Sequence, residues 1–219
     1  MENIIEIKNY TKKLKGNIIL DHVDLNVEKG TIIWLKGKNG SGKTMLLRAM
    51  CGLIMPDEGE AIVNGTRLNA KQRFPKDTGI LIENTRFWKN YTAFETLKIL
   101  AEINRKIGDD DIRTTLERIG LDPYDRKKVG KFSLGMKQKL AIAQAIMEQP
   151  ELLLLDEPTN ALDQESVNIA RKVILEENGR GATVVIASHI EEDIKDLCRE
   201  TVIIDKGRIV SGESVLSHT

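Results

Sequence analysis

The stretch GKNGSGKT occupies residues 37–44 and has three glycines in six positions, followed by lysine and threonine. It follows the apolar run TIIWL (residues 31–35) and opens TMLLRAMCGL (residues 44–53), which has the apolar spacing of a helix. A glycine-rich turn between a strand and a helix aims its backbone N–H groups, and the positive end of the helix dipole, at phosphate oxygens. The sequence therefore predicts a phosphate-binding loop.

Each residue type in this loop has a predicted role toward a bound nucleotide. The three glycines allow the backbone to bend so that successive N–H groups face inward. Lys43 is expected to reach the β- and γ-phosphates and to be solvated when it does not, and Thr44 offers a hydroxyl to Mg²⁺. The predicted nucleotide contacts are Gly37, Lys38, Asn39, Gly40, Ser41, Gly42, Lys43, Thr44 and Met45.

A second part of the site is predicted at the ends of two apolar runs. ELLLLDEP (residues 151–158) ends in Asp156 and Glu157, and ATVVIASH (residues 182–189) ends in His189. Ligands gather at the carboxyl ends of parallel strands, so Asp156 is expected to hold Mg²⁺ and Glu157 to face the attacking water. His189 would approach the γ-phosphate. A solvated turn for the two acids, and a structural cap for the histidine, are the alternatives.

Composition restricts the class of protein. The chain has 219 residues, enough for one large domain, and 33 basic residues balance 33 acidic ones. A net charge of zero lacks the electrostatic footprint of a nucleic-acid binder. Cys51 and Cys198 have neither metal-ligand nor disulfide-framework spacing, which favours a reduced, cytosolic protein. No apolar run approaches the roughly 20 residues that span a bilayer, so no transmembrane segment is expected.

The remaining patterns predict an α/β fold with a parallel-sheet core. Strand-like runs dominate the first 70 or so residues, whereas residues 84–149 show helical spacing and form a candidate inserted helical subdomain. The apolar runs that end in Asp156 and His189 flank the helical stretch QESVNIARKVILEENGR (residues 164–180). Together, the two runs and the helix predict a β-α-β unit of a parallel sheet. ETVIIDKGRIVSGES (residues 200–214) predicts a hairpin that turns at residues 205–207.

Five motifs in one order carry a family resemblance: GKNGSGKT, FSLGM (residues 132–136), LLLLDEP (residues 152–158), ALD (residues 161–163) and His189. Together they resemble the nucleotide-binding domain of an ABC transporter, across nearly the whole chain. The resemblance implies a P-loop NTPase fold in which residues 1–219 form a single domain. The domain would have a parallel-sheet core with an N-terminal antiparallel β subdomain, and a helical subdomain at about residues 84–149 would be inserted in the core. It also implies ATP and Mg²⁺ as cofactors.

The resemblance further implies partners. In the family, two ATPase chains clamp ATP beneath a multi-span membrane permease, so the chain would be cytoplasmic and peripheral at the inner face of the cell membrane. The second chain would be another copy or a paralogue. The FSLGM turn and the ALD motif would then contact the nucleotide of the other chain, through Ser133, Leu134, Gly135, Met136 and Asp163. A serine that only caps its own helix is the alternative for Ser133.

Several positions depart from the usual family pattern. Leu134 and Met136 stand where glycine and glutamine are usual, and Leu14 stands where an aromatic residue stacks on adenine. Base stacking is worth about 1–3 kcal/mol in single-stranded nucleic-acid sites, so purine affinity or selectivity is expected to be weaker, unless Tyr10 compensates. Glu83 replaces a glutamine that approaches Mg²⁺ and the water. An ordinary exposed glutamate at a strand end is the alternative for Glu83.

The resemblance predicts the ATP-hydrolysing subunit of a membrane transporter that works by ATP-driven dimerisation. ILIEN (residues 80–84) and FSLGMKQKL (residues 132–140) are similar to the branch that exports, or confers immunity to, bacitracin and lantibiotic-type peptides. A soluble, non-transport ATPase of the same fold is the alternative. Such proteins usually join two cassettes or insert a long coiled coil, and this chain has neither pattern. A small-molecule kinase would leave FSLGM and ALD unexplained.

Overall fold

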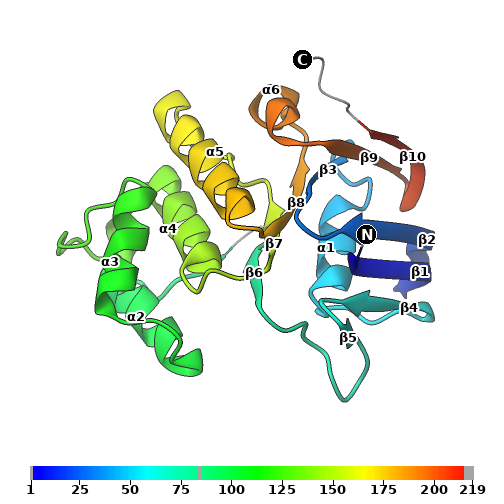
Figure 1. Cartoon of the computed structure of the whole chain (residues 1–219), viewed down its shortest axis with the longest axis horizontal. Coiled ribbons are helices and arrows are strands. Elements are labelled where there is room, and N and C mark those ends of the chain that lie inside the picture. Colours follow the sequence, from blue (N-terminus) through cyan, green and yellow to red (C-terminus); the bar gives the residue numbers. More distant parts are fainter. Residues whose placement is uncertain (1, 83–84, 215–219) are drawn as a thin grey trace.

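The structure is a computed structural model that describes residues 2–82 and 85–214. A six-stranded sheet forms its centre, in the order β10-β9-β3-β8-β7-β6 (Figure 1). Five of these strands run parallel to their neighbours, and the last strand pairs antiparallel to β9. Their bounds are β3 (Ile32–Lys36), β6 (Thr78–Leu81), β7 (Leu152–Asp156), β8 (Thr183–Ser188), β9 (Glu200–Asp205) and β10 (Arg208–Ser214).

A second, four-stranded antiparallel sheet has the order β2-β1-β4-β5. Its strands are β1 (Asn3–Leu14), β2 (Asn17–Glu28), β4 (Glu58–Val63) and β5 (Thr66–Arg67). The α-helices are α1 (Lys43–Met50), α2 (Ala93–Asn104), α3 (Asp109–Arg118), α4 (Leu134–Ile146), α5 (Gln164–Gly179) and α6 (Glu191–Ile194). Two short 3₁₀ helices, Val129–Lys131 and Lys195–Leu197, complete the elements.

The central sheet is covered on both faces, which explains its continuous apolar strands. Along β7, Leu153 and Leu155 pack into a cluster with α2, α3, α4 and α5. The alternate residues, Leu152 and Leu154, pack into a second cluster with α1 and the antiparallel sheet. Figure 1 shows this sandwich, with α2, α3, α4 and α5 on one side of the central sheet and α1, β1, β2 and β4 on the other. Strands buried on both faces cannot alternate apolar and polar residues.

Local signals set the helices between β6 and β7. Thr92 caps α2 through the Glu95 N–H at 3.1 Å, and the Glu95 carboxylate accepts the Thr92 N–H at 2.7 Å. This reciprocal pair satisfies two backbone donors that the first helical turn leaves unpaired. α2, α3 and α4 share one apolar cluster. The subdomain bounds at residues 84–149 stay a prediction.

An ion-pair network ties α3 to α5. Glu177 is 2% exposed, and its two carboxylate oxygens accept hydrogen bonds from Arg118 at 2.8 Å and from Arg180 at 2.7 Å. Arg180 also donates to the carbonyl of Pro150, which precedes β7. A buried carboxylate is stable only with such charged donors around it. The network therefore holds the helical layer against the central sheet.

The α/β fold predicted from the sequence is confirmed, as are the first strands, the β-α-β unit and the final hairpin. The sequence patterns did not predict that β9 joins the central sheet beside β3. Both cysteines are free and buried, and burial raises the pKa of Cys51 to about 11 and that of Cys198 to about 12. Within the described residues, no helix has the length and hydrophobicity that crossing a membrane requires.

Candidate functional site

The predicted phosphate-binding loop connects β3 to α1. Gly40 has a φ of 79° and Gly42 a φ of 115°, a region that residues with a Cβ rarely adopt. An added Cβ at Gly37 would lie 2.5 Å from the carbonyl oxygen of Ile204 in β9. Glycine is therefore required at these positions for the turn itself and for its close approach to the sheet.

Lys43 differs from the sequence expectation. We expected a solvated side chain, but Lys43 is only 5% exposed. Its ammonium group donates to the carbonyl oxygens of Gly37 at 2.6 Å and Lys38 at 3.2 Å. A buried ammonium needs such acceptors, and the curved loop supplies them from its own backbone. Lys43 thus has a structural contact in addition to its predicted phosphate contact.

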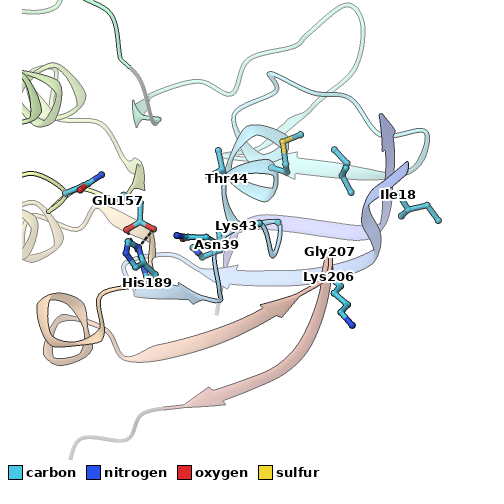
Figure 2. A pocket seen from close by; sticks show the side chains of 13 residues that line it. Ile18, Asn39, Lys43, Thr44, Glu157, His189, Lys206 and Gly207 are labelled. Atoms are coloured by element: carbon cyan, nitrogen blue, oxygen red, sulfur yellow. Dashed lines mark hydrogen bonds and ion pairs between the residues drawn. The ribbon is translucent and has the colours of Figure 1, made fainter. Parts of the chain in front are cut away.

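A cavity of about 620 Å³ opens beside the loop (Figure 2). It brings together residues from the loop, from the end of β7 and from the end of β8, which lie far apart in the sequence. The predicted residues that line it are Asn39, Gly40, Gly42, Lys43, Thr44, Met45, Glu157 and His189. The residues that sequence analysis missed are Ile18, Ile19, Asn160, Lys206 and Gly207.

Glu157 directly follows the C-terminal end of β7 and has a constrained backbone conformation. Its φ is 48°, unusual for a residue other than glycine, and its N–H donates to the carbonyl of Ala187 at 2.8 Å. The carboxylate accepts a hydrogen bond from Ser188 Oγ at 3.1 Å, and its Oε1 lies 2.8 Å from His189 Nδ1. The end of β8 therefore fixes the position of this carboxylate, and Figure 2 shows the pair facing each other.

Gln138 of α4 is a further residue that sequence analysis missed. Its side-chain amide donates to the carbonyl of Glu157 at 2.9 Å and to that of Pro158 at 3.1 Å. The helix that begins after Ser133 is thus hydrogen-bonded to the backbone that carries Glu157. A glutamine in the run MKQKL resembles an ordinary helix-surface residue, so no sequence signal could have identified it.

Asp156, the last residue of β7, lies opposite Ala187 in the parallel register and is 2% exposed. In residues 2–82 and 85–214, no group of three or more His, Cys, Asp or Glu side chains could hold a metal ion. Mg²⁺ does not require such a cage, because it commonly binds one or two carboxylates together with substrate phosphates. The hydroxyl of Thr44 and the carboxylate of Asp156 are hard oxygen donors of that kind. These residues fit Mg²⁺.

The FSLGM turn begins α4 and does not line the cavity of its own chain. Ser133 is the N-cap, and its Oγ accepts the Met136 N–H at 3.1 Å. Leu134 is 73% exposed. An added Cβ at Gly135 would lie 3.0 Å from the carbonyl of Ala161, so the turn packs closely on the ALD motif. The predicted trans contacts of Ser133, Leu134, Gly135 and Met136 stay predictions.

The ALD motif ends at the N-cap of α5. Asp163 Oδ1 accepts the Ser166 N–H at 2.8 Å. Hydrogen bonds from Ser166, first from its side chain and then from its backbone, hold the pKa of Asp163 below its ordinary value. Asp163 is therefore a cap within its own chain, and its predicted contact with a second chain's nucleotide stays a prediction.

The structure shows where Leu14 and Tyr10, the two predicted candidates for contact with the adenine base, lie relative to the cavity. Tyr10 is fully buried and donates its hydroxyl hydrogen to the carbonyl of Ile54 at 2.8 Å, so it cannot stack on a base. Leu14 ends β1 and is 43% exposed, but it is not among the residues that line the cavity. Ile18, two positions beyond the Lys15–Gly16 turn, does line it. Glu83 lies outside the described residues.

The chain is similar in sequence to known ATP-binding proteins. The family model described as "ABC transporter" matches residues 20–160. YybJ of Bacillus subtilis (strain 168), an uncharacterized ABC transporter ATP-binding protein, is 48% identical over 97% of this chain and 98% of its own length. The bacitracin transport ATP-binding protein BcrA of Enterococcus faecalis is 36% identical over 96% of this chain and 69% of its own length.

The fold is also that of solved cassettes. The dimeric structure of a post-hydrolysis state of the ATP-binding cassette MJ0796, bound to ADP and Pi, superposes with a TM-score of 0.88 at 23% identity. That match covers 98% of this chain and all of the other. With the phosphate loop and the family match, these relatives show that the chain belongs to the ABC transporter family, as an ATP-binding subunit that couples ATP hydrolysis to transport.

Proposed function

We propose that this chain binds Mg-ATP in the cavity beside the phosphate loop and hydrolyses it with Glu157 as the general base. The observation that carries the proposal is the meeting of Lys43 and Thr44 with Glu157 and His189 around one cavity. Three separate elements supply these groups. A phosphate-binding turn and a fixed carboxylate on the opposite wall are the two parts that attack of water on a γ-phosphate requires.

The phosphate loop would hold the triphosphate. Its backbone N–H groups and the N-terminus of α1 face the phosphates, and Lys43 exchanges its contacts with the Gly37 and Lys38 carbonyls for phosphate oxygens. Thr44 and Asp156 are the ligands we propose for Mg²⁺, which when bound neutralises charge on the β- and γ-phosphates. Whether Glu83 joins this shell is a separate prediction, treated in the Discussion.

Glu157 would accept a proton from the attacking water, and the end of β8 would orient it. Ser188 and His189 both contact its carboxylate, which restricts the side chain to one direction. A general base works only within hydrogen-bond reach of the proton it removes. His189 is therefore a positioning residue for Glu157, and its exposed ring can also approach the γ-phosphate.

Two chains would complete two sites. Ser133, Leu134, Gly135 and Met136 lie at an exposed helix N-terminus that their own cavity does not use, which supports a contact with the nucleotide of a second chain. A serine hydroxyl and N–H groups at a helix start are suited to an anion. Asp163 would take part through the neighbouring turn. The second chain would be another copy or a paralogue.

The membrane partner would be a multi-span permease, with this chain peripheral at the cytoplasmic face of the cell membrane. Residues 1–219 would act as one ATPase domain, with the helical part at about residues 84–149 inserted in its core. BcrA is a bacitracin transport ATP-binding protein. By analogy we propose export, with peptide antibiotics as the substrate class. The similarity to transporter subunits disfavours the soluble ATPase alternative.

One experiment tests the composite site. Glu157→Gln keeps the shape of the side chain and removes the base, so Mg-ATP should bind, persist and hold two chains together. Size-exclusion chromatography with light scattering should show a dimer with Mg-ATP and a monomer without nucleotide. Adding Ser133→Arg places a bulky cation at the proposed contact and should abolish the dimer.

The outcomes separate the elements of the proposal. A Glu157→Gln protein that turns over ATP at the wild-type rate removes Glu157 from the mechanism. A variant that binds ATP but stays monomeric at high concentration contradicts homodimerisation by this chain alone. Repeating the measurement with a reconstituted permease, or with a paralogous cassette, then identifies the missing partner.

A further inference from the structure

The outer end of the cavity is built from segments that the phosphate loop does not include. Ile18 and Ile19 of β2 form one part of it, and Lys206 and Gly207 form the other (Figure 2). The two lysines of the cavity differ in position, with Lys43 at the loop and Lys206 at the turn between β9 and β10. A nucleotide whose phosphates contact the loop would direct its base toward this outer end.

The β9–β10 turn is fixed against both the phosphate loop and β2. The Gly207 N–H donates to the Ser41 carbonyl at 2.8 Å, and the Gly207 carbonyl accepts the Asp21 N–H at 2.9 Å. An added Cβ at Gly207 would lie 2.5 Å from the carbonyl of Ile19. Arg208 adds a hydrogen bond from Nε to Asp21 at 2.7 Å. The turn is thus a fixed wall of the cavity.

This wall would recognise a base without an aromatic side chain. In the part of the chain that the structure describes, the residues lining the cavity include no Phe, Tyr or Trp. Ile18 is 50% exposed, so its apolar side chain is available to the face of a base. Apolar contact with a flat face does not distinguish one purine from another. Selectivity must therefore come from a polar group at the base edge.

Lys206 is a cation that lines this end of the cavity. Its side chain is exposed, and among residues 2–82 and 85–214 it forms no ion pair. Lysine only donates hydrogen bonds. Guanine presents two acceptors, O6 and N7, side by side, whereas adenine places an amino donor next to its N7. A lysine at this edge therefore stabilises bound guanine more than bound adenine.

We propose that Ile18 and Lys206 hold the base, and that this chain uses GTP as well as ATP. The inference rests on the proposed nucleotide site and adds its base specificity. Hydrolysis is the same in both cases: water attacks the γ-phosphorus, the bond to the β–γ bridging oxygen breaks, and the products are phosphate and the nucleoside diphosphate. Lys206 determines specificity and takes no part in that step.

The test measures the Kd of ATP and GTP, with Mg²⁺, by displacement of a fluorescent ATP analogue. For the wild-type protein we expect the two values to agree within about threefold. Lys206→Ala should weaken GTP about tenfold and ATP by less than about threefold, since a good lysine–guanine contact is worth about 1–3 kcal/mol. Lys15→Ala is the matched control, because Lys15 is also an exposed turn lysine, with a φ of 49° against 47° for Lys206.

Three results would overturn the inference. They are a wild-type preference for ATP above about a hundredfold, no change in either Kd for Lys206→Ala, and equal weakening of both nucleotides, which would assign Lys206 to the phosphates. None of these affects the proposed ATPase site, because ATP binding and its loss in Lys43→Ala would remain. A wild-type protein that binds neither nucleotide would instead contradict the proposed function itself.

Discussion

The carboxylate of Glu157 lies against the imidazole of His189, with Oε1 2.8 Å from Nδ1, although the two residues are 32 positions apart in the chain. Ser188 provides a second contact to the same carboxylate. If His189 orients the base, its removal should reduce turnover much more than binding. The geometry therefore indicates that the two residues act together, with His189 orienting the Glu157 carboxylate. Comparing the rate of turnover with the affinity for ATP measures that role.

His189→Ala should lower the rate of ATP hydrolysis about 10- to 100-fold, and change the Kd of ATP by less than about threefold, because the base remains but loses its fixed direction. Single-turnover phosphate release and equilibrium binding measure the two effects. His189→Asn, which keeps a donor, should recover part of the rate. His22→Ala, on β2 beside Asp21, is the control. A drop in affinity as large as the drop in rate would argue against a positioning role.

Lys43→Ala should abolish detectable ATP hydrolysis and weaken ATP binding, since the ammonium group no longer meets the phosphates. The burial of Lys43 adds a stability effect that the sequence did not predict. The carbonyl oxygens of Gly37 and Lys38 lose their donor, which should lower the free energy of unfolding by about 1–3 kcal/mol. Phosphate release and urea unfolding test the two statements. A variant that keeps most of its hydrolysis would contradict the phosphate-loop assignment.

Ile18→Ala and Leu14→Ala form a matched pair on one hairpin. Both side chains are aliphatic and partly exposed, at 50% and 43%, but only Ile18 lines the cavity. Ile18→Ala should weaken ATP binding about fivefold, and Leu14→Ala by less than about twofold, since packing of the Ile18 side chain on the base is worth about 1 kcal/mol. Titration calorimetry with Mg-ATP measures both. The reverse order would restore Leu14 as the base contact.

Glu83→Gln should raise the Mg²⁺ concentration that gives half-maximal ATP hydrolysis, because an amide binds Mg²⁺ more weakly than a carboxylate. The prediction comes from the sequence alone, since Glu83 lies outside the described residues. Steady-state hydrolysis across a Mg²⁺ series at fixed ATP provides the measurement. An unchanged Mg²⁺ curve would return Glu83 to the role of an exposed strand-end residue.

Glu177→Ala should destabilise the fold far more than the neighbouring Glu176→Ala. Glu177 is buried between Arg118 and Arg180, and its removal takes a carboxylate partner from each, leaving Arg118 paired with Glu176 at the surface. We expect a decrease of about 2–4 kcal/mol in the free energy of unfolding for Glu177→Ala and less than about 1 kcal/mol for Glu176→Ala, whose side chain is 41% exposed. Urea unfolding at neutral pH compares the two. Equal decreases would mean that the buried network contributes nothing beyond a surface pair.

The features that could be predicted from the amino-acid sequence depend on residues close together in the chain. Gly40 and Gly42 specify the loop because only glycine readily adopts their φ angles. Ser133 and Asp163 cap helices through N–H groups three residues away. The apolar runs before Asp156 and His189 predicted buried parallel strands, and strand direction then put both residues at one edge of the sheet.

Which distant groups meet was settled by tertiary packing. Register shifts between Tyr10 and Lys13 in β1 interrupt the alternation of side chains, so the sequence did not reveal that Ile18, and not Leu14, reaches the cavity. The contact of Gly207 with Ser41 joins residues from opposite ends of the chain. Such contacts depend on how whole elements pack, because the conformational preferences of neighbouring residues do not indicate which distant backbone group they will contact.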